Sequence, residues 1–255
     1  MRIESLYRYP VKGLTPERLN QAALSPGRCI PWDRAFALAQ GDGAFDAANP
    51  AWVSKSNFMC LLKNASITLL QTRFDEAAGL LGFTAPDGGA FEASPFSPEG
   101  QAAIARFLTY YLGDEARFGP AGRAPSFHYV EAHSFCDHQS QVVSLIGLGS
   151  LQALEQAAGA VRDKRRFRAN LYVEDIEPWA EFNWLGREIA IGETRLAVQE
   201  RIDRCGATTV NPDTGLRDAN PVLELKRGFG HIELGVFAEV LVGGQIKPGD
   251  AVCVV

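Results

Sequence analysis

The sequence lacks the features that would assign it to several large protein classes. It has no apolar stretch near the roughly 20 residues of a membrane span, and its first residues lack the apolar core of a signal peptide. It also contains no Walker loop, no Gly-x-Gly-x-x-Gly fingerprint and no Gly-x-Ser-x-Gly elbow, which argues against nucleotide binding and serine hydrolysis. We therefore expect a cytoplasmic protein without a membrane partner.

Cysteine is scarce, and the cysteines are not arranged in pairs. The five of them form no Cys-x-x-Cys motif, so neither a disulfide framework nor a cysteine zinc site is indicated, and we expect reduced thiols. His128, His133 and His138 lie near Cys136, but their spacing fits neither a helical His-x-x-x-His pair nor a zinc finger.

Basic residues are too few for general binding to nucleic acid. The chain has 25 Lys and Arg against 30 Asp and Glu, a net charge of −5, whereas phosphate-backbone binding needs a broad cationic face. Five basic residues nevertheless crowd into residues 162–168. Such a cluster is usually a solvated face, but here it indicates a local pocket for an anion.

Composition and periodicity predict a strand-rich globular protein. Hydrophobic residues make up 46% of the 255 positions, enough for one large core or two modest ones. The clearest helical pattern covers residues 98–112, with Ser97 placed to cap it, and a second helix is expected after Ser150. Short apolar runs bounded by Gly, Pro and Asp predict strands at residues 3–9, 35–40, 66–71, 80–84, 170–173, 194–199, 235–242 and 251–255.

Two glycine-bounded segments share one pattern near the C-terminal end. Residues 186–193 and 243–250 both read Gly-x-x-Ile-x-x-Gly followed by an acidic residue. We expect equivalent barrel hairpins, in which the glycines adopt positive φ and Ile189 and Ile246 point into the core.

One stretch is rich enough in Gly, Pro and Ala to be a linker. It covers residues 113–126. We therefore divide the chain into a smaller β unit, residues 1–119, and a larger one, residues 120–255.

The most informative stretch is residues 201–215, RIDRCGATTVNPDTG. It brackets Cys205 with Arg201 and Arg204 and ends in a turn sequence. A free cysteine is most often a small buried hydrophobe, but arginines beside a thiol favour the thiolate and bind anions. We expect Cys205 at the end of a strand, beside an anionic ligand, as a metal ligand or a sulfur carrier.

The basic cluster leads directly into an expected strand. Arg166, Arg168 and Asn170 alternate just before the apolar residues 171–173, which predicts that their side chains share one face of a strand. Three donors on one face suit an anion.

Taken together, these motifs resemble MOSC-domain proteins that carry an N-terminal β-barrel domain. That group includes the mitochondrial amidoxime-reducing components and the C-terminal part of molybdenum-cofactor sulfurases. The most specific matches are Arg204-Cys205 with residues 208–215 (TTVNPDTG), residues 166–170 (RFRAN), where the family usually has proline for Ala169, and residues 244–252 (GQIKPGDAV). The end-to-end resemblance implies a mostly β fold with some helix, in which an N-terminal β-barrel domain packs on a C-terminal MOSC β-barrel.

The resemblance also implies roles for individual residues. In the family a cysteine ligates molybdenum, while arginine, asparagine and backbone groups hold the pterin and its phosphate, so Cys205 is the implied metal ligand and catalytic residue. Lys12 and Arg34 alone would be surface residues, but they lie in matches to the family, residues 9–12 (YPVK) and residues 33–34 (DR). The implied cofactor-binding residues are Lys12, Arg34, Ser140, Arg168, Asn170, Arg204 and Thr209.

One position departs from the family pattern. Gly13 stands where a serine commonly follows the lysine, which removes one hydrogen-bond donor from the implied phosphate site.

The resemblance implies a molybdenum-cofactor-dependent oxidoreductase that reduces N-hydroxylated or related N-oxygenated compounds. Because no cysteine-rich ferredoxin module follows Val255, we expect a separate ferredoxin- or cytochrome-type electron donor. Two alternatives stay open. One is a cofactor- or sulfur-carrier protein that uses a Cys205 persulfide, and the other is a structural β-barrel interaction module.

Overall fold

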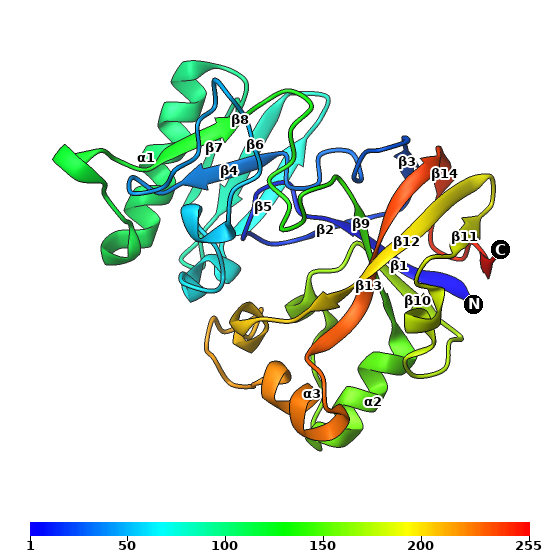
Figure 1. The fold of residues 1–255 in the computed structure, drawn as a ribbon. Helices are drawn as coiled ribbons and strands as arrows, with labels where there is room; N and C mark the ends of the chain where they lie inside the picture. Colours follow the sequence, from blue (N-terminus) through cyan, green and yellow to red (C-terminus); the bar gives the residue numbers. More distant parts are fainter.

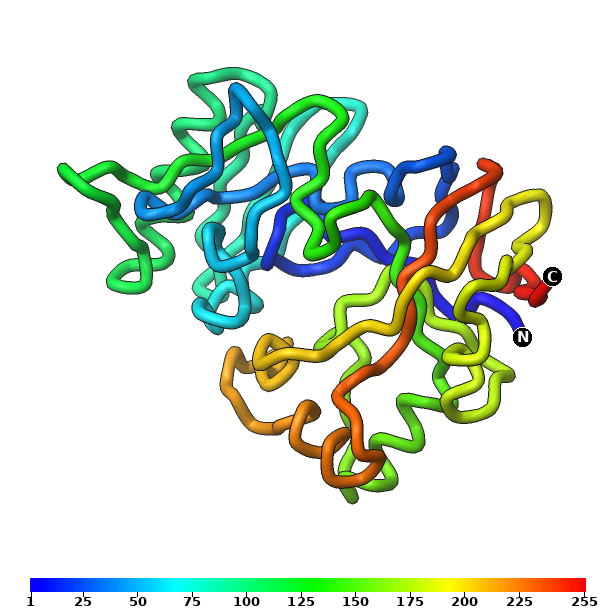
Figure 2. The backbone as a smooth tube through the Cα atoms, viewed as in Figure 1, coloured from blue at the N-terminus to red at the C-terminus, as the bar shows by residue number.

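The chain folds into two lobes, each with its own β-sheets. The computed structural model describes all of residues 1–255. The lobe at upper left in Figure 1 holds the elements from β4 to β8 and is called the middle lobe; the other, the terminal lobe, holds both chain ends. Figure 2 shows the N-terminal segment, in dark blue, crossing the terminal lobe before the chain enters the middle lobe.

An eight-stranded sheet forms the terminal lobe. The strands of this lobe are β1 (Arg2–Arg8), β2 (Glu17–Leu19), β3 (Ala22–Leu24), β9 (Val143–Gly147), β10 (Leu171–Glu174), β11 (Glu188–Ile191), β12 (Thr194–Asp203), β13 (Glu233–Val242), β14 (Gly244–Ile246) and β15 (Val252–Val254). The sheet order is β15-β11-β12-β13-β9-β10-β1-β2, with β3 and β14 as a separate pair. All neighbours are antiparallel except β9 and β10. The strand-rich prediction is confirmed.

The sheet curves until its two ends approach each other. Ile3 N donates to the carbonyl of Asp250 at 2.9 Å, and Gly249 N donates to the carbonyl of Ile3 at 2.7 Å. Arg2 and Ala251 form an isolated bridge beside them. These bonds join β1 to the segment before β15, but the strands do not form one continuous closed barrel.

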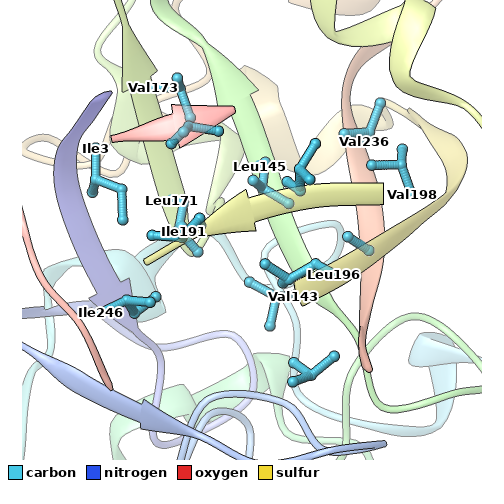
Figure 3. Close-up of a cluster of buried hydrophobic side chains, with 14 of the residues drawn as sticks. Ile3, Val143, Leu145, Leu171, Val173, Ile191, Leu196, Val198, Val236 and Ile246 are labelled. Atoms are coloured by element: carbon cyan, nitrogen blue, oxygen red, sulfur yellow. The ribbon is translucent and has the colours of Figure 1, made fainter. Parts of the chain in front are cut away.

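Twenty buried apolar side chains form the core of the terminal lobe. Period-two alternation places them on the inner face of the sheet, as Figure 3 shows for labelled residues of several strands. Full burial of a Val, Leu or Ile side chain contributes about 1.5–3 kcal/mol, so Ile3 and Leu6 make β1 an integral part of this lobe. The residues labelled are Ile3, Val143, Leu145, Leu171, Val173, Ile191, Leu196, Val198, Val236 and Ile246.

The middle lobe packs one helix beside two small sheets. Its strands are β4 (Phe36–Ala39), β5 (Gln71–Asp75), β6 (Leu80–Thr84), β7 (Ala90–Ala93) and β8 (Ser126–Tyr129), ordered β4-β8 and β5-β6-β7. Helix α1 (Pro98–Leu112) has the predicted bounds because its start is encoded locally: Ser97 Oγ accepts from Gly100 N, and proline occupies the first position. Ile104 and Leu108 join a core of 18 residues.

Two further helices cover the terminal lobe. They are α2 (Leu148–Ala158) and α3 (Pro221–Phe229), which pack on each other and share a small core with Tyr172. Helix α2 begins two residues before Ser150, not after it. None of the three helices has the length and apolar character needed to cross a membrane.

Strand pairing crosses the division drawn from the sequence. β1, β2 and β3 come from residues 1–119 but pair within the terminal lobe, whereas β8 comes from residues 120–255 and pairs with β4. The expected linker, residues 113–126, contains two short 3₁₀ helices and runs into β8. The division at residue 119 stays a prediction about sequence modules, and each lobe contains strands from both sides of it.

The strand predicted at residues 66–71 is wrong. The chain there forms a 3₁₀ helix, Ala65–Leu69, and β5 begins only at Gln71. Ile67 is fully buried, so the apolar character was real, but a short apolar run does not distinguish a strand from a helical turn.

The predicted alternation of Arg166, Arg168 and Asn170 on one strand is also wrong. Arg166 lies in a 3₁₀ helix, Lys164–Phe167, and Arg168 has left-handed backbone, φ 54°. The Asp163 side chain caps that helix by accepting a backbone N–H. This local hydrogen bond competes with the extended conformation, so β10 begins only after Asn170.

The repeat prediction is confirmed in part. Residues 186–193 contain the first strand and the turn of the antiparallel hairpin β11–β12, and Ile189 and Ile246 are both fully buried. Residues 243–250 make no hairpin, because β14 pairs with β3 while β15 pairs with β11.

Candidate functional site

A cavity of about 390 Å³ lies where the two lobes meet. Seven of its lining side chains are cationic and four are acidic, although the whole chain carries net negative charge. The cations are Lys12, Arg34, Lys55, Arg166, Arg168, Arg201 and Arg204, and the acids are Asp33, Asp137, Glu200 and Asp203. A cavity of this size and charge at a lobe interface suits an anionic small molecule.

Cys205 lies just beyond the end of β12, as predicted. Its backbone is extended, and it starts the 3₁₀ helix Gly206–Thr209. The partly exposed residue lines the cavity, and its Sγ is 3.3 Å from Lys55 Nζ. The thiol is therefore accessible from the cavity and has a cation beside it.

Asp137 connects the two lysines of the cavity. Its carboxylate forms ion pairs with Lys12 and, at 3.8 Å, with Lys55. Partial withdrawal from water raises the pKa of Asp137, but the two ammonium groups outweigh this effect and lower it to about 2. Burial lowers the pKa of Lys55, while Asp137 and Cys205 raise it, and the net direction is upward. Lys55 is thus a cation at neutral pH.

Two arginines flank the buried ring of Tyr9. The Cζ atoms of Arg34 and Arg168 lie 4.5 Å and 4.3 Å from the ring centroid. Arg34 Nη2 also donates to the Arg168 carbonyl at 2.9 Å. Both residues have positive φ, 50° and 54°, which is unusual for a side chain with a Cβ and is found preferentially at functional sites.

These two arginines keep N–H donors available. Burial lowers the pKa of Arg34, but the neighbouring Asp33 reverses the direction, so it is raised overall. Burial lowers the pKa of Arg168 to about 10, and the positive charge of Arg34 adds to that effect. Arg168 Nη1 donates to the Leu14 carbonyl at 2.6 Å, while its Nε and Nη2 make no hydrogen bond within the protein. Those groups could bind an anion in the cavity.

Arg204 and Asn170 line the cavity, but the fold uses most of their hydrogen-bonding groups. Arg204 is 8% exposed and donates from Nε to the Leu234 carbonyl at 2.8 Å; burial lowers its pKa to about 10. Asn170 Oδ1 accepts from Ser144 Oγ at 2.8 Å, and Nδ2 donates to the Tyr7 carbonyl at 3.2 Å. Asn170 thus joins β9 to β1, while Arg204 joins β13 to the 3₁₀ helix Lys164–Phe167 through a second bond to the Phe167 carbonyl at 2.8 Å.

Two residues predicted to bind cofactor lie outside the cavity wall. Ser140 is exposed, and Thr209 Oγ1 donates to the Gly206 carbonyl at 2.7 Å. The hydroxyl groups that line the cavity belong to Ser144 and Thr208. Roles for Ser140 and Thr209 stay predictions.

Gly13 is required by the backbone and by its neighbours. Its φ is +87°, and a Cβ there would lie 2.9 Å from Ile67 Cδ1 and 3.0 Å from the carbonyl oxygen of Met59. Gly13, which stands where the family commonly has serine, thus allows two backbone segments to approach closely next to Lys12.

Local sequence patterns do not indicate Lys55 and Asp137 as site residues. Lys55 lies in a polar segment without a motif, and Asp137 lies between Cys136 and His138, whose side chains suggest only a metal site. Their proximity to Cys205 and Lys12 arises from contacts between distant segments, which no local pattern records.

The fold and the site define a two-lobed β-rich protein with a cysteine and an arginine-rich cavity at the lobe interface. The model of the MOSC domain matches residues 126–253, and the model of the MOSC N-terminal beta barrel domain matches residues 1–115. The chain therefore belongs to the MOSC-domain family, in the group that carries this N-terminal domain.

Two curated proteins are similar to this chain. It is 26% identical over 172 residues to mitochondrial amidoxime reducing component 2 of Rattus norvegicus, a match that covers 58% of this chain and 50% of that protein. It is 36% identical over 73 residues to molybdenum cofactor sulfurase of Anopheles gambiae, which covers 28% of this chain and 9% of that protein. The matches thus span half of the first relative and a small part of the second.

Among solved structures, the YuaD protein from Bacillus subtilis has a similar course of the backbone. The superposition has a TM-score of 0.49 at 13% sequence identity and covers 99% of this chain and 94% of the other.

Proposed function

We propose that this protein binds the molybdenum cofactor in the cavity between its lobes and reduces N-hydroxylated or related N-oxygenated compounds. The observation that best supports this proposal is that Cys205 opens onto the same cavity as Arg34 and Arg168. The molybdenum of this cofactor needs a soft sulfur ligand, and its pterin phosphate needs cationic hydrogen-bond donors. Family membership and both named relatives support the link to the molybdenum cofactor, and the name of amidoxime reducing component 2 alone supports the reduction.

The residues present fit such a group. Cys205 would supply one sulfur to molybdenum, and no cluster of three or more His, Cys, Asp or Glu side chains competes as a metal site. Arg168 would hold the phosphate with its free Nε and Nη2 groups and Arg34 with its Nε, because both Nη atoms of Arg34 already donate to Asp33 and to the Arg168 carbonyl; Lys12 would add charge. The seven cations of the cavity exceed its four acids, so the cavity would balance the charge of an anionic ligand.

When bound, the cofactor supplies the two-electron redox chemistry at its metal. The net reaction cleaves an N–O bond, consumes two electrons and two protons, and releases the oxygen as water. A separate ferredoxin- or cytochrome-type reductase as electron source is part of this proposal. The chain's own contribution is to bind and orient the cofactor and to neutralise its phosphate.

The decisive experiment measures molybdenum by mass spectrometry and pterin by fluorescence, on protein made in a cofactor-producing host. We expect about one of each per chain. Cys205→Ser should keep its circular dichroism spectrum but lose turnover, because serine replaces the soft ligand. Cys253→Ser is the matched control, since Cys253 is exposed in β15 and does not line the cavity.

Two results would contradict the proposal. Wild-type protein without molybdenum and pterin would exclude it, and sulfane sulfur on Cys205 in that protein would favour the sulfur-carrier alternative. A folded Cys205→Ser variant with undiminished turnover would refute the ligand assignment.

A further inference from the structure

Arg217 is an exposed cation that makes four hydrogen bonds but no ion pair with an acidic residue. Its Nη1 donates to the Gly206 carbonyl at 2.9 Å and to Thr209 Oγ1 at 2.8 Å. Its Nη2 donates to the carbonyls of Leu61 and Leu62, both at 2.9 Å. The planar guanidinium uses all four Nη hydrogens and holds two loops at a fixed separation.

Both of these loops belong to the cavity wall. Leu61 and Leu62 line the cavity from the middle lobe, and Gly206 directly follows Cys205 in the terminal lobe. The loops touch closely here, because a Cβ on Gly206 would lie 3.1 Å from Leu62 Cδ1. Arg217 does not itself line the cavity, so it acts on the site through these neighbours.

The backbone that carries Arg217 is also held in place. Arg217 forms an isolated antiparallel bridge with Val210, and Asn211 N donates to the Leu216 carbonyl at 2.7 Å. The loop between them therefore closes on itself. The guanidinium therefore extends from a fixed base, at the far end of the loop that follows the short helix Gly206–Thr209.

We propose that Arg217 is the positioning residue for Cys205. It braces the 3₁₀ helix after the cysteine against Leu61 and Leu62, and so keeps the thiol at the cavity and next to Lys55. The four hydrogen bonds of Arg217, called the brace, are present in the chain without cofactor. The expected effect of the brace on turnover rests on the proposed function.

The first test uses cofactor-free full-length protein. Hydrogen exchange is followed over residues 206–210, and alkylation of Cys205 by iodoacetamide is followed by peptide mass spectrometry at one fixed pH. For Arg217→Ala we expect both rates to rise roughly tenfold, because a few hydrogen bonds govern local opening of an exposed turn. Arg217→Lys keeps the charge but cannot bridge both loops, so it should resemble Arg217→Ala.

Arg227→Ala is the matched control. Arg227 is exposed on α3 and its side chain makes no hydrogen bond or ion pair, so this variant should match wild type in both rates. Circular dichroism should be unchanged in all variants. Wild-type rates in Arg217→Ala would overturn the proposal, and so would wild-type rates in Arg217→Lys, since charge alone would then explain the effect.

The second test uses cofactor-loaded protein and separates the two proposals. Arg217→Ala should lower kcat several-fold with little change in KM, because it displaces the cysteine and not a substrate contact. If wild type takes up no molybdenum, the proposed function fails while the exchange and alkylation rates still report on the brace. If wild type is loaded and active and Arg217→Ala has wild-type kcat, the positioning role fails alone.

Discussion

Gly13→Ser would restore the residue that the family commonly has after the lysine, yet it should destabilise this protein. A side chain at φ +87° carries a backbone cost of about 1–2 kcal/mol. The new Cβ would also lie 2.9 Å from Ile67 Cδ1 and 3.0 Å from the Met59 carbonyl oxygen. Ile67 is fully buried and the carbonyl is backbone, so neither can move aside cheaply, and such crowding costs about 1–3 kcal/mol more.

The expected total loss in the free energy of unfolding is about 2–5 kcal/mol, measured by urea denaturation. Gly249→Ser is the matched control. Gly249 has nearly the same φ, +91°, but no atom lies within 4 Å of a Cβ there, so only the backbone cost applies. The difference between the two variants measures the crowding at Gly13. Equal losses would refute the close-packing explanation, and a smaller loss at Gly13 would refute the geometry itself.

Two further predictions concern charge at the cavity. Arg168→Lys should weaken cofactor retention by about 1–3 kcal/mol, seen as pterin per chain, because lysine lacks the guanidinium fork; Arg162→Ala should retain cofactor as wild type does, since Arg162 pairs with Glu224 outside the cavity wall. Asp137→Asn should be less stable than wild type at neutral pH. The pKa of Asp137 is lowered to about 2, so its contribution is present above the usual carboxyl pKa of about 4 and lost as pH falls towards 2. The unfolding free energies of the two proteins should therefore converge near pH 2, and a gap that stays constant with pH would contradict the ion-pair assignment.

The sequence by itself determined the features that depend on short-range physics. The bounds of α1 follow from a serine cap and an N-terminal proline, and the burial of Ile189 and Ile246 follows from strand alternation between glycines. Cys205 at a strand end follows from the turn sequence after it. Each depends on residues within a few positions of one another.

Only the tertiary structure decided which segments meet. It placed β1 and β3 in the terminal lobe, directed Arg204 toward backbone carbonyls, and brought Lys55 to Cys205. It also showed that a 3₁₀ helix interrupts the expected alternation before Asn170. The physical reason is that the free energy of these arrangements comes from burial and hydrogen bonds between distant segments, which local patterns in the sequence do not encode.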